Sequence, residues 1–83
     1  MLRPHARFRA HTHMRPLFLC RACGRPWPCS TARLVLLALY RDNREGLRNL
    51  LSGRLMIAMA DQPRIDPVAL ATRFLGWIPP DDP

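Results

Sequence analysis

The chain has 83 residues, a net charge of +7 and an isoelectric point near 11.3, and all 13 of its basic residues are arginine. A single domain of this size needs help from a metal, a disulfide or a partner subunit to stabilise its small hydrophobic core. The odd number of cysteines excludes a framework of disulfides alone, and the longest apolar run, residues 34–40, is too short to span a bilayer.

The N-terminal residues 1–10 have no helical or strand periodicity and no apolar run of the kind that a signal peptide needs. We therefore expect a basic arm here, with His5 exposed to solvent, and a cytoplasmic location. A reducing compartment favours metal or redox chemistry of the cysteines over disulfides. Residues 1–33 hold seven arginines and no acidic residue, so this end of the chain should attract phosphate or an acidic protein surface.

The next segment, residues 11–29, gathers every cysteine of the chain behind two histidines. These residues are Cys20, Cys23, Cys29, His11 and His13. Three prolines exclude a helix and predict short extended pieces and turns. Two cysteines three positions apart can direct both sulfurs at one ion, and the glycine that follows them permits a positive φ. Three thiolates and one imidazole complete a tetrahedral set, so we predict a structural zinc knuckle with His11 or His13 as the fourth ligand.

Three other interpretations of the cysteines stay open. A redox pair is one, although a thioredoxin-type site needs a strand before the motif and a helix directly after it. An iron–sulfur cluster is another, although such clusters commonly use four cysteines. The third is a set of reduced cysteines without a metal. Within the motif, Trp27 stands between two prolines, and we expect it to cover one side of the metal.

A first helix is expected over residues 31–42, with Ser30 or Thr31 as its N-cap. Its run of seven apolar residues has no alternation and is apolar on nearly every side. This pattern predicts a buried helix rather than an exposed strand.

Two further helices are expected, over residues 44–60 and 67–77. In the second helix, apolar residues recur with helical period after a cap near Asn43, and Asp61 to Pro63 end it. The third starts with Asp66 as N-cap and proline at its first position. Phe74 and Trp77 are the expected core anchors of this helix. The chain thus reads as mainly α: an arm (1–10), a zinc knuckle (11–29), a three-helix body (30–78) and a tail (79–83).

The string Cys20-Arg-Ala-Cys23-Gly-Arg-Pro-Trp-Pro-Cys29 resembles the C-x-x-C-G-x-P-W-P-C motif of short uncharacterised actinobacterial proteins. Their closing R-F-L-x-W is matched here by residues 73–77, whereas Phe18 stands where they usually have tryptophan. The resemblance implies zinc binding and favours His11, because a histidine nine residues before the first cysteine recurs in that group. Some members carry a flavin-reductase label. This chain is too short for a flavin domain and has no phosphate-binding glycine loop.

The sequence offers no catalytic constellation, since its acids are few and scattered and no histidine stands at a predictable distance from Ser30. We therefore expect no enzyme and no small-molecule substrate, but a regulatory or binding module that engages nucleic acid or an acidic protein partner. The arginines expected to make these contacts are Arg7, Arg9, Arg15, Arg21 and Arg25. Two alternatives remain: a thiol-redox or metal-responsive sensor, and a protein adaptor that does not bind nucleic acid.

Overall fold

The computed structural model describes residues 10–80, and its secondary structure is mainly helical. Its elements are β1 (His13–Met14), β2 (Leu19–Cys20), α1 (Ser30–Leu39), α2 (Arg44–Asp61) and α3 (Pro67–Leu75). The prediction of a mainly α chain, with an irregular knuckle ahead of three helices, is confirmed. The expected arm, with His5, Arg7 and Arg9, lies outside the described residues except for Ala10, and so do residues 81–83 of the expected tail.

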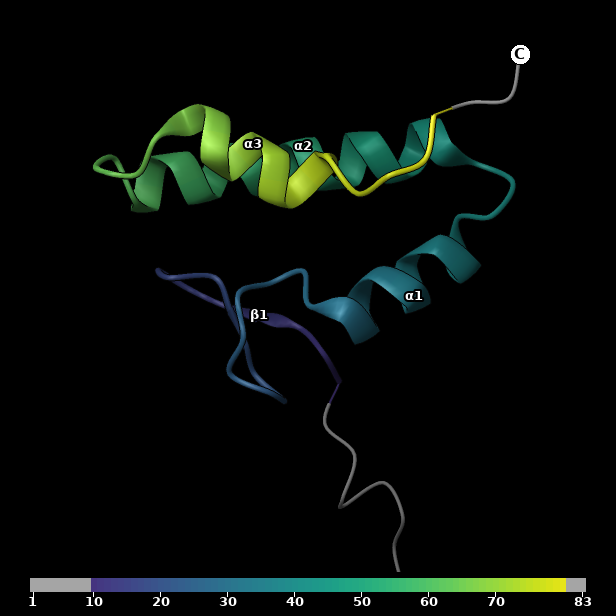
Figure 1. The fold of residues 1–83 in the computed structure, drawn as a ribbon, viewed down its shortest axis with the longest axis horizontal. Helices are drawn as coiled ribbons and strands as arrows, with labels where there is room; N and C mark the ends of the chain where they lie inside the picture. Colours follow the sequence, from purple (N-terminus) through teal and green to yellow (C-terminus); the bar gives the residue numbers. More distant parts are fainter. Residues whose placement is uncertain (1–9, 81–83) are drawn as a thin grey trace, which may run out of the picture.

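The two C-terminal helices, α2 and α3, lie side by side and form one layer of the molecule (Figure 1). The knuckle and α1 form a second layer against them. Local sequence explains both helix starts: the Asn43 side chain accepts a hydrogen bond from the Gly46 amide at 2.9 Å, and the Asp66 carboxylate accepts one from the Val68 amide at 3.1 Å. Both predicted caps are confirmed.

The layer of α2 and α3 is held by the apolar stripe that the helical period predicts. Its buried members are Leu47, Leu51, Leu55 and Ala58 on α2 and Leu70 and Phe74 on α3. Burial of such a stripe supplies most of the stability of short helices, because propensity alone is too weak. None of the helices in residues 10–80 has both the length and the apolar character needed to cross a membrane.

Helix α1 departs from the expected buried helix over 31–42. It ends at Leu39, only Ala32 is buried, and Leu34 and Leu39 are 69% and 73% exposed. In the described part of the chain, α1 makes no contact with α2 or α3 comparable to the one between those two helices. The physical reason is that α2, α3 and the knuckle already cover one another's apolar surfaces. Only one edge of α1 therefore reaches the core.

The expected N-cap of α1 is also wrong. The cap position belongs to Cys29, and no side chain makes a capping hydrogen bond there. Ser30 is the first residue of the helix itself, so neither its hydroxyl nor that of Thr31 can act from the cap position.

An aromatic cluster joins the knuckle to α3. The Phe18 and Trp27 rings both meet the edge of Phe74, with centroids 5.6 and 6.0 Å away. Beside them, the Arg73 guanidinium donates to the carbonyls of Phe18 and Trp27 at 2.9 and 3.0 Å. Burial lowers the pKa of Arg73 from its ordinary value. Phe74 is fully buried, as expected of a core anchor, whereas Trp77 is only partly buried.

Candidate metal centre

The knuckle backbone turns back on itself twice. β1 and β2 pair antiparallel with His13 opposite Cys20, and the turn between them contains Phe18 at a φ of 53°. The second turn follows Cys20, whose carbonyl accepts the Gly24 amide at 2.8 Å and whose amide donates to the Arg25 carbonyl at 2.7 Å. Gly24 adopts a φ of 75°, the positive value for which a glycine was expected after the second cysteine. The two turns bring distant parts of the knuckle to one point.

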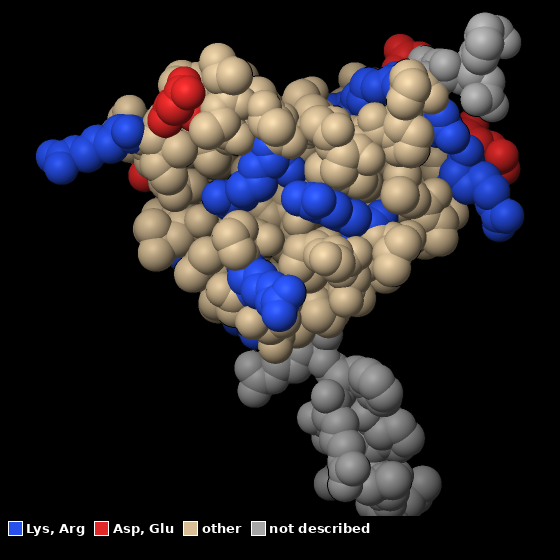
Figure 2. Space-filling model, viewed as in Figure 1, with Lys and Arg blue, Asp and Glu red and all other residues tan. Residues whose placement is uncertain are grey.

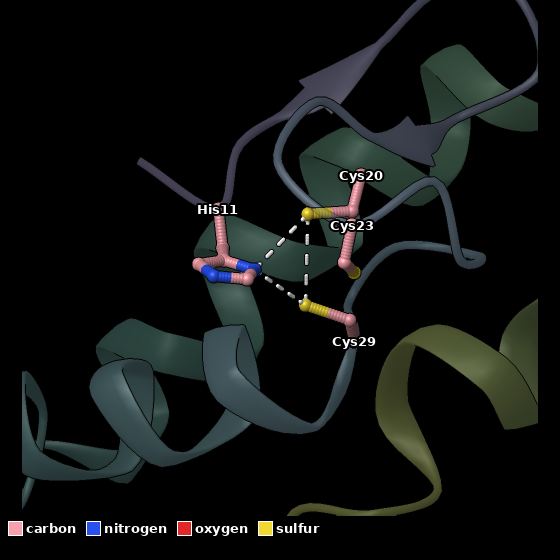
Figure 3. A group of neighbouring side chains, drawn as sticks. All are labelled: His11, Cys20, Cys23 and Cys29. Carbon is pink, nitrogen blue, oxygen red and sulfur yellow. Dashed lines mark hydrogen bonds between the residues drawn. The ribbon is translucent and has the colours of Figure 1, made fainter. Parts of the chain in front are cut away.

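Four side chains meet at this point (Figure 3): His11, Cys20, Cys23 and Cys29. One ligand atom from each lies within 4.8 Å of all the others. His11 Nδ1 is 3.2 Å from Sγ of Cys20 and from Sγ of Cys29, and these two sulfurs are 3.7 Å apart. In a tetrahedral zinc site with Zn–S bonds near 2.3 Å, two sulfurs stand about 3.8 Å apart. A disulfide needs about 2.05 Å. The spacing fits shared coordination of one ion, and all three cysteines are free.

Trp27 holds the backbone of His11 in place. The indole Nε1 donates to the His11 carbonyl at 2.9 Å, and the Trp27 side chain is itself buried against Phe74. Sequence analysis assigned Trp27 to cover the metal. The contact that the structure shows is with the backbone of the ligand residue. An aromatic anchor of this kind limits how far the imidazole can move from the sulfurs.

His13 lies outside the ligand cluster, although it is only two residues from His11. Its ring stacks on Phe18 with centroids 4.6 Å apart and an interplanar angle of 6°, and it also meets Trp27 at 5.0 Å. Burial lowers the pKa of His13, and the charges of Arg54, Arg15 and Arg21 lower it further. The neutral ring therefore belongs to the aromatic cluster, and His11 is the histidine that the structure places with the cysteines.

The thiols differ in exposure and acidity. Cys20 and Cys29 are buried, whereas Cys23 is exposed. Burial acts to raise the pKa of Cys20, but the amides of Cys23 and Ala22 and the neighbouring thiols outweigh it and bring the pKa to about 7. At Cys29, burial dominates and raises the pKa. Two negative charges 3.7 Å apart repel each other and disfavour ionisation of both buried thiols, whereas a cation that binds both sulfurs would favour the ionised form of each.

The arginines expected to contact a partner have different environments. The Arg15 guanidinium binds the Asp61 carboxylate through two hydrogen bonds of 2.7 and 2.9 Å, so it fastens the knuckle to the end of α2. Arg21 and Arg25 are exposed. Figure 2 shows basic side chains spread across the middle of one face and acidic side chains towards its upper edges.

Sequence reasoning missed the role of Arg73, whose guanidinium ties α3 to the knuckle. Its two acceptor carbonyls lie 55 and 46 positions away in the chain, so no local spacing predicts the contact, and the one sequence signal at Arg73 is that it begins the R-F-L-x-W match. The pairing of Arg15 with Asp61 was missed for the same reason.

In comparisons with known proteins, no family model matches the chain, and neither a curated protein nor a solved structure shows significant similarity to it.

Proposed function

We propose that this protein is a zinc-stabilised binding module rather than an enzyme, and that the ion is structural. The observation that carries the proposal is the cluster of His11 and the three cysteines. Three thiolates and one imidazole are a donor set that zinc favours, and a closed set of four protein ligands leaves no position for a substrate. Such a site contributes roughly 10–16 kcal/mol of apparent binding free energy to folding. A reducing compartment such as the cytoplasm keeps the thiols available.

The proposed partner is an acidic protein surface. Two exposed arginines, Arg21 and Arg25, lie in a stretch, residues 10–41, that contains no acidic residue, so this part of the molecule favours an anionic partner. The exposed apolar side of α1 favours a protein, because a phosphate backbone offers no apolar surface to cover it. Nucleic acid is the second candidate and rests on the arginines alone.

The metal is tested by elemental analysis of protein purified without added metal. We expect one equivalent of zinc in the wild type. Because loss of an outer-shell group alone costs about 10–100-fold in metal affinity, His11→Ala should weaken zinc binding by at least about 100-fold. Cys23→Ser should also weaken it. The matched control is His13→Phe, which keeps an aromatic ring on Phe18 and should retain zinc. A folded, metal-free wild type, or iron with inorganic sulfide, would contradict the zinc proposal.

The partner class is tested by a gel-shift assay with generic duplex DNA and RNA at low salt. We expect no retardation at micromolar protein. A shifted band that is lost in Arg21→Ala/Arg25→Ala, and that weakens steeply with salt, would favour nucleic acid instead.

A thiol-redox or metal-responsive sensor stays as the alternative because one ligand, Cys23, is exposed to solvent. It predicts that dilute peroxide releases zinc and that a thiol reductant restores binding. Zinc that is retained under these conditions would remove this alternative.

A further inference from the structure

An apolar groove runs between α1 and the start of the knuckle. It encloses about 360 Å³, with Ala10, His11 and Thr12 on one side and Ala32, Val35 and Leu36 on the other. Trp27, which holds the His11 carbonyl, also lines it. The groove is therefore bounded on one side by a helix and on the other by a backbone segment that the ligand cluster fixes.

The helical side of the groove continues beyond it as an apolar stripe, in which Ala32 is buried, Leu36 is partly buried, and Val35 and Leu39 are exposed. Ala32, Val35, Leu36 and Leu39 follow one another at i, i+3, i+4 and i+7, and so lie on one side of α1. Val35 is 50% exposed and Leu39 is 73% exposed. A stripe with this spacing beside a groove is the surface against which an amphipathic helix packs in helix-in-groove recognition.

An exposed arginine lies near each end of the stripe. Arg25 shares a surface hollow with Ser30 and Thr31 at the N-terminal end of α1, and Arg41 follows two positions after Leu39. Within residues 10–80, neither guanidinium takes part in an ion pair. The ten residues of α1 span about 15 Å, so the two positive charges lie within reach of one short helix.

We propose that this groove binds an amphipathic acidic helix of a partner protein. The apolar face of that helix packs on Val35 and Leu39, and its carboxylates pair with Arg25 and Arg41. The inference rests on the proposed function, because it specifies the acidic partner named there. A second copy of this chain fits the groove less well, since it brings a surface with the same arginines and a further net charge of +7. Nucleic acid leaves the apolar stripe uncovered.

The test uses the full chain loaded with zinc and a fluorescein-labelled synthetic peptide that places leucine on one face of a helix and glutamate on the others. Fluorescence anisotropy should show saturable binding. Val35→Glu/Leu39→Glu should weaken it at least about tenfold, because these side chains occupy the centre of the interface. The matched control is Met56→Glu/Val68→Glu, which changes two apolar residues on α2 and α3 that are 68% and 70% exposed. The control should bind the peptide as the wild type does.

The electrostatic part is tested by reversing charges on both sides. Arg25→Glu/Arg41→Glu should weaken binding of the glutamate peptide and gain binding of a peptide with lysine in place of glutamate. A scrambled peptide of the same composition should bind poorly, because it has no apolar face.

Zinc content and circular dichroism of every variant separate this inference from the proposed function. If the wild type holds one equivalent of zinc but does not bind the peptide, the proposed role of the groove is overturned and the proposed metal site still stands. Equal losses in the control pair, or equal binding of the scrambled peptide, also overturn it. If sedimentation shows a dimer and Leu39→Glu dissociates it, the surface binds a second copy of the chain. If the protein binds duplex nucleic acid and Val35→Glu abolishes that binding, the surface binds nucleic acid.

Discussion

The bond between Arg15 and Asp61 joins residues that are 46 positions apart, and it gives Arg15 a structural role where the sequence suggested a contact with a partner. The guanidinium is 60% exposed, so the pair contributes modestly to stability. The hydrogen bond from Arg15, and then its charge, lower the pKa of the Asp61 carboxyl. The ion pair is therefore fully formed above the ordinary carboxyl pKa of about 4 and is lost as the pH falls through the lowered value.

Replacing Asp61 with asparagine should lower the free energy of unfolding at neutral pH, and the difference from wild type should shrink as the pH falls below about 4. Urea unfolding over a pH series measures this difference. Zinc content is measured at each pH, and only conditions in which both proteins hold the same amount of zinc are compared, because Arg15 lies in the knuckle that the proposed ion stabilises. A difference that stays constant through the acid range would show that Asp61 acts through packing alone.

Contacts of single residues also determine which histidine, His11 or His13, lies with the cysteines. Spacing allowed either histidine to complete the ligand set, because both precede the cysteines by a similar distance. The contacts that separate them are the Trp27 hydrogen bond to the His11 carbonyl and the stacking of His13 on Phe18. Both depend on how the knuckle folds back on itself. The donor types of the site could thus be predicted from sequence, whereas the identity of the histidine needed three-dimensional contacts or a resemblance.

At the scale of elements, the helices differ in how well the sequence predicts them. α2 and α3 start at local caps and share an apolar stripe, so their positions follow from nearby residues. The prediction that α1 is a helix is confirmed, whereas the prediction that this helix is buried is wrong. Burial depends on whether other elements have apolar surface left to offer, and here α2 and α3 largely cover each other. A run that is apolar on every side therefore predicts that a helix forms. It does not predict which other element, if any, will cover that helix.

Two glycines in α2 provide a test of helix propensity. A β-carbon at Gly53 would have no atom within 4 Å, so Gly53→Ala should stabilise the protein by roughly 0.5–1 kcal/mol. A β-carbon at Gly46 would lie 2.4 Å from the Asn43 side chain, which caps the helix. Gly46→Ala should therefore disturb a cap worth about 1 kcal/mol and give no net gain. Thermal unfolding of the two variants measures the contrast, and equal stabilisation would contradict it.

Arg73 contributes two hydrogen bonds to the junction between the knuckle and α3. Arg73→Met keeps an apolar stem beside Phe74 but leaves the carbonyls of Phe18 and Trp27 without their donors. Because hydrogen bonds to a charged group contribute about 1.5–3 kcal/mol each, we expect a loss of roughly 3 kcal/mol in chemical denaturation. Arg73→Lys should lose less, since one ammonium can still reach a carbonyl. If both variants are as stable as the wild type, the two hydrogen bonds of Arg73 do not contribute measurably to the free energy of unfolding.

At the scale of the whole molecule, the knuckle is part of the core. Phe18 and Trp27 belong to the same buried cluster as the leucines of α2 and Phe74 of α3. A domain of this size has a total stability of about 5–15 kcal/mol, which is no larger than the free energy that a structural zinc ion supplies. If the proposed zinc ion is bound, its contribution is therefore large enough to decide whether the knuckle folds and whether α3 keeps its aromatic cover.

Removing zinc with a chelator should expose Trp27. Much of the helical signal should remain, because the apolar stripes of α2 and α3 can still pack against each other. Tryptophan fluorescence should shift to longer wavelength, and far-UV circular dichroism should change less. Added zinc should restore both signals, whereas magnesium should not, since it prefers oxygen ligands. An unchanged fluorescence spectrum after complete removal of the metal would show that packing alone holds the knuckle.

Cys29 ends the knuckle and also occupies the N-cap position of α1, while His11 lines the groove beside that helix. The ligand cluster and the groove therefore share His11, and Cys29 connects the cluster to the helix on the other side of the groove, so an ion that orders the cluster would also order the groove. Thermodynamic reciprocity then sets a requirement on the whole protein. The factor by which zinc strengthens binding of the acidic helix must equal the factor by which that helix strengthens retention of zinc. If the proposed zinc ion and acidic helix both bind, the lifetime of the metal in this protein would thus measure whether the partner is present.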